Sequence, residues 1–170
     1  MDLRVRGDAP AAPFLAARDL LAAEHEVSLP VEVQVGEDPD ERTRAVHRED
    51  RHVVHVSRRA AASAMARELA LHEFAHVVRH EQAHPSHTHD TGKALFLALA
   101  GRGVERRKVV HCYQIANHMT DVYADDLTLS VGPGDRLVAF LESELAAALA
   151  DRPTDAVGSA SDQSLGGSSD

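Results

Sequence analysis

The stretch from Arg58 to Gln82 contains neither glycine nor proline, and this feature constrains the fold more than any other in the chain. Apolar side chains such as Met65, Leu69 and Phe74 cover most of its surface when the stretch is drawn as a helix. A helix that is apolar on most of its faces has to be covered by other parts of the chain. We therefore predict one long, largely buried helix over these residues.

Two short segments before this helix have the composition of strands. Valine alternates with polar residues from Val31 to Val35, and the segment from His52 to Ser57 is rich in valine. An alanine-rich stretch that starts near Pro10 predicts a helix ending near Val27. Gly36 to Asp50 holds nine charged residues and a proline, so we expect a loop or an exposed irregular excursion there.

The C-terminal half is predicted to be helical up to its tail. His84-Pro85 ends the long helix, and the polar segment that follows, up to Gly92, is expected to be a loop. Three further helices are predicted, at Lys93–Ala100, Val104–Leu127 and Asp135–Ala150. Residues 153–170 are rich in serine, glycine and aspartate and cannot bury enough surface to fold. We therefore expect a single domain over residues 1–152 and a disordered tail over 153–170.

Composition excludes several classes of protein. With 27 acidic and 18 basic residues the net charge is -9, which repels phosphate backbones, so we expect no nucleic-acid partner. No apolar run approaches the roughly 18 residues of a membrane span, and the first residues lack the apolar core of a signal peptide. We therefore expect a cytoplasmic protein without an integral membrane segment. The single cysteine, Cys112, excludes a multi-cysteine metal site.

The motif with chemical content is His72-Glu73-Phe74-Ala75-His76, which has the HExxH pattern. Residues four apart on a helix share one face, about 6 Å apart along the axis, so both imidazoles can bind one ion. Glu73 then lies beside the metal, where it can take a proton from a water that zinc acidifies. The competing interpretation is a pair of stacked core histidines without a metal.

A third protein ligand has to come from another segment. His80 lies about 12 Å from His72 along the same helix axis, which is too far for one ion. In the predicted helix from Val104 to Leu127, Asp121 and Asp125 share a face, and His118 lies one turn before Asp121. Geometry permits either Asp121 or His118 as the third ligand. A solvated acidic face without a metal is the plainer alternative for the two aspartates.

These residues resemble the zincin-like metallopeptidases of the gluzincin type. In the HtpX-like and CAAX-prenyl-protease group of that superfamily, a later helix carries ExxAD, and Asp121-Val-Tyr-Ala-Asp125 is similar to it. The resemblance implies zinc bound by His72, His76 and Asp121, with Asp125 orienting the first motif histidine. It departs from the family in having Asp for Glu at position 121. The aspartate and alanine excess, with only two lysines in the chain, also resembles proteins of salt-loving archaea, and a small haloarchaeal zincin-like family is the membership that we expect.

The expected fold is therefore α+β and zincin-like, with a small sheet packed on the long HExxH helix and a second, ligand-bearing helix crossing behind it. The expected function is zinc-dependent hydrolysis of a peptide or protein substrate, with Glu73 as general base. The alternative is a non-catalytic protein of the same fold that binds metal or regulates a partner.

Other polar residues near the motif leave several roles open. His84, His87 and His89 are expected to be exposed in a flexible loop rather than to hold a second metal. The candidates for a donor that stabilises the oxyanion are His80, His111, Tyr113 and Tyr123.

Overall fold

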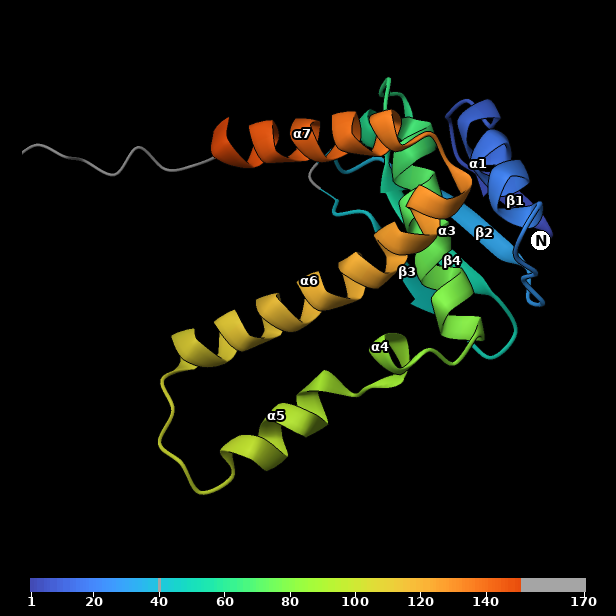
Figure 1. The fold of residues 1–170 in the computed structure, drawn as a ribbon. Helices are drawn as coiled ribbons and strands as arrows, with labels where there is room; N and C mark the ends of the chain where they lie inside the picture. Colours follow the sequence, from blue (N-terminus) through green and yellow to red (C-terminus); the bar gives the residue numbers. More distant parts are fainter. Residues whose placement is uncertain (40, 151–170) are drawn as a thin grey trace, which may run out of the picture.

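The computed structural model describes residues 1–39 and 41–150 of the chain, which form an α+β fold with a small mixed sheet (Figure 1). In chain order the elements are β1 (Leu3–Arg6), α1 (Ala12–Ala22), β2 (Val31–Gly36), β3 (Arg44–His47), β4 (His52–Ser57), α2 (Arg58–Ala61), α3 (Ala66–Glu81), α4 (Pro85–Thr88), α5 (Thr91–Leu99), α6 (Arg106–Val131) and α7 (Gly134–Ala150). The predicted tail over residues 153–170 lies outside the described residues.

The sheet has four strands in the order β1-β2-β4-β3. β1 and β2 are parallel, as are β2 and β4, with Val33 opposite Val5 on one side and Val54 on the other. Helix α1 makes the crossover between β1 and β2, because parallel neighbours cannot be joined by a tight turn. β3 runs antiparallel to β4 and forms one edge of the sheet.

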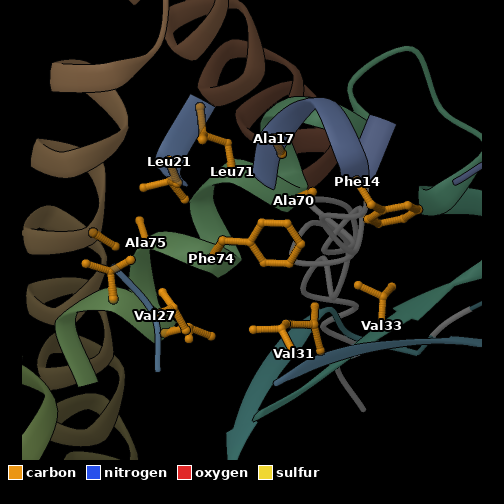
Figure 2. Packing of buried hydrophobic residues seen from close by; sticks show 14 of the residues in the cluster. Phe14, Ala17, Leu21, Val27, Val31, Val33, Ala70, Leu71, Phe74 and Ala75 are labelled. Carbon is orange, nitrogen blue, oxygen red and sulfur yellow. The ribbon is translucent and has the colours of Figure 1, made fainter. Parts of the chain in front are cut away.

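Helices α1 and α3 lie side by side on the sheet and enclose the core (Figure 2). Phe14 and Leu21 of α1 and Phe74 of α3 are at most 1% exposed, and they pack above Val31 and Val33 of β2. The alternation predicted for β2 is confirmed, since its odd-numbered valines point into this core. Burial of this apolar surface is the main force that holds α3 in place.

The predicted helix from Arg58 to Gln82 is divided into α2 and α3, which corrects the expectation of one continuous helix. β4 runs directly into α2, and the Ser57 hydroxyl caps α2 by accepting a hydrogen bond from the Ala60 amide at 3.2 Å. The chain has to turn before it can pack back onto the sheet. The turn between Ala62 and Met65 allows α3 to do so.

Two strands and the end of one helix also differ from the expectations. The segment predicted to be irregular, Gly36 to Asp50, contains β3, and the N-terminal segment contains β1. Both are four-residue strands at the edges of the sheet, where half-exposed positions admit charged residues and weaken the strand pattern. Helix α1 ends at Ala22 rather than near Val27, which is instead a buried residue of the following loop.

The C-terminal helices follow the predicted order, and they extend away from the sheet. α6 packs on α3 through the buried residues Ala124, Leu127 and Thr128 near its end, while its first half projects outward with α5 beside it (Figure 1). α7 turns back at Gly132, where a Cβ atom would come within 3.0 Å of a Leu71 methyl group, and buries Leu137 near its start. Among the described residues, no helix is both long and apolar enough to cross a bilayer.

A polar cluster ties the end of α3 to the sheet. The Glu81 carboxylate accepts hydrogen bonds from the amides of Ser28 and Leu29 and lies 3.0 Å from Nε2 of the buried His52. The rings of His47 and His80 stack at 3.8 Å, which joins β3 to α3. This cluster places β3 against α3 one turn beyond the motif histidines.

Candidate metal centre

Helix α3 presents His72 and His76 on one face, turned toward α6. The neighbouring positions Leu71, Phe74 and Ala75 are buried in the core, so helical periodicity leaves the two histidines at its border. Their Nε2 atoms lie 3.1 Å apart. Stacking, the alternative interpretation, does not describe the pair, because the rings are edge to face with an interplanar angle of 83°.

Helix α6 brings the third side chain of the site. Asp121 Oδ1 lies 3.5 Å from His76 Nε2 and 4.0 Å from His72 Nε2. A tetrahedron whose corners lie about 2.0–2.2 Å from its centre has edges of about 3.3–3.6 Å. The three separations, 3.1, 3.5 and 4.0 Å, lie within about 0.4 Å of that range, so small shifts of the side chains would bring the three atoms to the spacing of ligands of one zinc ion. Within residues 1–39 and 41–150, this is the only group of three or more His, Cys, Asp or Glu side chains with ligand atoms all within 4.8 Å of one another.

The remaining ring nitrogen of each motif histidine has its own partner. His72 Nδ1 lies 2.8 Å from Asp125 Oδ1, and His76 Nδ1 lies 2.8 Å from His87 Nε2. A partner that accepts a hydrogen bond from Nδ1–H leaves the Nε2 lone pair free to bind a metal. Both imidazoles are thus held with Nε2 directed toward Asp121.

The role of His87 corrects the expectation that it is exposed in a flexible loop. Pro85 begins the short helix α4, and this turn carries His87 back against α3. Its Nδ1 lies 2.7 Å from the Ser86 hydroxyl, which in turn lies 2.7 Å from His84 Nδ1. Proline at the first helical position was the local signal for this turn. Only His89 of the three loop histidines is exposed as expected.

Electrostatics at the site favour a bound cation. Burial disfavours the protonated ring of His72, but the hydrogen bond to Asp125 and the nearby charges of Glu73 and Asp121 outweigh it and raise the pKa of His72. Burial lowers the pKa of His87 to about 4, so its ring is neutral at pH 7 and can accept the proton of His76 Nδ1–H. The carboxyl groups of Glu73, Asp121 and Asp125 lie around the two motif imidazoles. A divalent cation would offset the negative charge of these groups.

Glu73 lies beneath this group, between α3 and β3. Its side chain is buried, and its carboxylate accepts a hydrogen bond from the backbone amide of Ala45 in β3. Burial raises the pKa of Glu73, while the nearby His72 and His76 act in the opposite direction. The carboxylate is thus held next to the two histidines.

The other candidate residues lie outside the cluster. The His118 side chain is 81% exposed and only its Nδ1 approaches Asp121, at 3.6 Å from Oδ2. His80 stacks on His47, Tyr123 contacts His84 with ring centroids 4.9 Å apart, and Tyr113 lines an apolar cavity between α5 and α6. His111 is exposed on α6. The structure brings none of the four candidate oxyanion donors between the motif histidines and Asp121.

The identity of the third ligand is tested by two substitutions on α6. We expect Asp121→Ala to weaken zinc affinity strongly, because it removes a ligand atom, and His118→Ala to change it little, because that ring is exposed to solvent. Affinity is measured by competition with a coloured chelator. The opposite ranking would make the site a three-histidine one and contradict the assignment of Asp121.

Positioning of the second histidine is tested at His87. We expect His87→Ala to lower zinc affinity by about 10–100-fold, the usual effect of losing a hydrogen-bond partner of a ligand. His87→Gln should recover part of the loss, because its amide oxygen can accept the same hydrogen bond. His89→Ala is the matched control in the exposed part of the same segment. Equal affinities for His87→Ala and His89→Ala would show that the contact does not orient His76.

Comparison with known proteins identifies the family of the chain. Neither curated proteins nor solved structures include a match to it. Residues 1–170, the whole chain, match the family described as a family of unknown function, DUF5781. The chain therefore belongs to DUF5781.

Proposed function

We propose that this protein is a zinc-dependent peptide hydrolase with a zincin-like arrangement of its site. The observation that carries the proposal is the convergence of His72 Nε2, His76 Nε2 and Asp121 Oδ1, with the Nδ1 atoms of both rings held by separate partners. Two core histidines without a metal have no need of this arrangement. A small sheet packed on the motif helix, and a second helix carrying the carboxylates, are also the parts that the zincin resemblance implies.

In the proposed reaction, His72, His76 and Asp121 would hold the zinc ion. A bound zinc ion would supply a Lewis acid that polarises the peptide carbonyl and acidifies a water molecule. Glu73 takes the proton of the attacking water on its carboxylate and passes it to the leaving amine. Asp125 and His87 keep the two rings in orientation throughout.

A non-catalytic metal-binding role is the second candidate, and one observation favours it. Glu73 is only 7% exposed, and its carboxylate accepts a hydrogen bond from the Ala45 amide. A base has to meet water, whereas a carboxylate that only fastens α3 to β3 does not. In that case the metal would stabilise the contact between α3 and α6 without turnover.

The two candidates are separated by zinc content and hydrolysis of a mixed peptide library read by mass spectrometry. We expect the purified protein to hold about one zinc and to cleave peptides, and Glu73→Gln to keep the zinc while losing activity by about 100-fold or more, the usual contribution of a general base. Glu68→Gln is the matched control, because Glu68 is also a buried glutamate of α3 but pairs with Arg67.

Two results would overturn the proposal. If the protein holds zinc but cleaves no peptide, the result supports the binding role. If it takes up no zinc and its melting temperature does not rise when zinc is added, the metal site does not exist. Activity in Glu73→Gln equal to that of Glu68→Gln would exclude Glu73 as the base.

A further inference from the structure

A chain of hydrogen bonds leads from the candidate metal centre to the start of α4. His76 Nδ1 lies 2.8 Å from His87 Nε2. On the other side of the His87 ring, Nδ1 lies 2.7 Å from the Ser86 hydroxyl, and that hydroxyl lies 2.7 Å from His84 Nδ1. A neutral imidazole has one nitrogen that donates a hydrogen bond and one that accepts, so the donors along this chain have to point in a consistent direction.

A backbone amide fixes that direction at His84. His84 precedes the first turn of α4, and its Nδ1 accepts a hydrogen bond from the Ser86 amide at 3.3 Å. Pro85, which lies between them, has no N–H, so the Ser86 amide is the first donor that the turn offers. Because His84 Nδ1 accepts this bond, it carries a lone pair, and the hydrogen of that ring is on Nε2. A hydrogen on Nδ1 would instead point at another N–H.

The other donors of the chain follow from this lone pair. The Ser86 hydroxyl donates its only hydrogen to His84 Nδ1, and its oxygen then accepts from His87 Nδ1–H. His87 Nε2 is left with a lone pair, which accepts from His76 Nδ1–H, so the lone pair of His76 is on Nε2, the atom that faces Asp121. The reverse direction would bring two lone pairs together between Ser86 and His84. It would also place a hydrogen on His76 Nε2, where a metal could not bind.

Packing holds this chain of hydrogen bonds against both helices that carry the candidate ligands. Helix α4 contacts α3 and α6. The ring of His84 lies against Tyr123 of α6, with ring centroids 4.9 Å apart. The Tyr123 carbonyl in turn accepts the hydrogen bond from Arg79 of α3. The position of His84 is therefore set by the same contact between α3 and α6 that brings Asp121 to the two motif histidines.

We propose that His84 and Ser86 are positioning residues of the metal centre, which act through His87 to hold His76 in the tautomer whose Nε2 can bind the ion. Affinity for a ligand falls in proportion to the fraction of the protein that is competent to bind it. A ring that is already in the binding tautomer therefore increases zinc affinity. This inference rests on the metal site of the proposed function but not on peptide hydrolysis.

The direction of the chain is measured by ¹⁵N NMR of the full-length protein at mildly alkaline pH. The two nitrogens of a neutral imidazole have well-separated shifts, which show the nitrogen that carries the hydrogen. We expect the hydrogen on Nδ1 of His87 and on Nε2 of His84, both without metal and after zinc is added. Neither ring is a proposed zinc ligand, so the result does not depend on whether zinc binds. A hydrogen on His87 Nε2 or on His84 Nδ1 would overturn the proposal.

A single and a double variant separate this role from simple packing. His84→Phe keeps a ring against Tyr123 but removes the acceptor, so the Ser86 hydroxyl is free to donate to His87 Nδ1 and to move the His87 hydrogen to Nε2. We expect zinc affinity to fall by about 10–100-fold, the usual effect when a ligand loses its hydrogen-bond partner. His84→Phe/Ser86→Ala lacks the opposing hydroxyl and should bind zinc more tightly than His84→Phe. Lost packing cannot give that recovery, and a double variant that binds no more tightly than the single one would contradict the proposal.

The hydroxyl itself is tested by three substitutions in α4. Ser86→Ala should lower zinc affinity and leave His87 in a mixture of tautomers, whereas Ser86→Thr keeps the hydroxyl and should behave as wild type. Thr88→Ala is the matched control, because it removes another α4 hydroxyl, which donates to the His84 carbonyl at 3.3 Å. Equal affinities for Ser86→Ala and Thr88→Ala, or a loss in Ser86→Ala without a change of the His87 tautomer, would exclude the role. A wild type that binds no zinc contradicts the proposed function instead, while spectra of the metal-free protein still decide the direction of the chain.

Discussion

The packing of α6 on α3 is the interaction on which the candidate site depends, because neither helix carries a complete set of ligands. Ala124 and Leu127 join the core beside α3. Arg79 of α3 donates a hydrogen bond from Nε to the Tyr123 carbonyl at 2.9 Å and pairs with Asp126. A slip of one turn moves a helical residue by about 5.4 Å, more than the distance between any two of the ligand atoms, so this contact decides whether a metal can bind.

The sequence predicts those parts of the site whose residues lie close together along the chain, and it does not predict contacts between distant segments. The pairs His72/His76 and Asp121/Asp125 are each four residues apart, and the helical repeat alone places each pair on one face. The contact of His76 with His87 depends on the path of the chain after α3. That path passes through Ala83 with φ of +49°, a left-handed conformation that alanine rarely adopts and that no local pattern indicates.

Of the two strands that the sequence pattern did not predict, β3 is the one that gives Glu73 its environment. β3 has only two apolar residues, Ala45 and Val46, and it forms by pairing with β4. Its amide at Ala45 holds the Glu73 carboxylate, and His47 stacks on His80 of α3. The walls of the site are therefore two helices, which periodicity could predict, and one edge strand, which tertiary pairing determines.

The central claim is that His72, His76 and Asp121 bind one metal ion, and anomalous diffraction from crystals of the zinc-loaded protein tests it most directly. Data collected on the two sides of the zinc absorption edge locate the ion independently of the protein atoms. We predict one strong anomalous peak within about 2.0–2.2 Å of His72 Nε2, His76 Nε2 and an Asp121 carboxylate oxygen. A peak at His84, His87 and His89 instead, or the absence of any peak in crystals that elemental analysis shows to contain zinc, would contradict the claim.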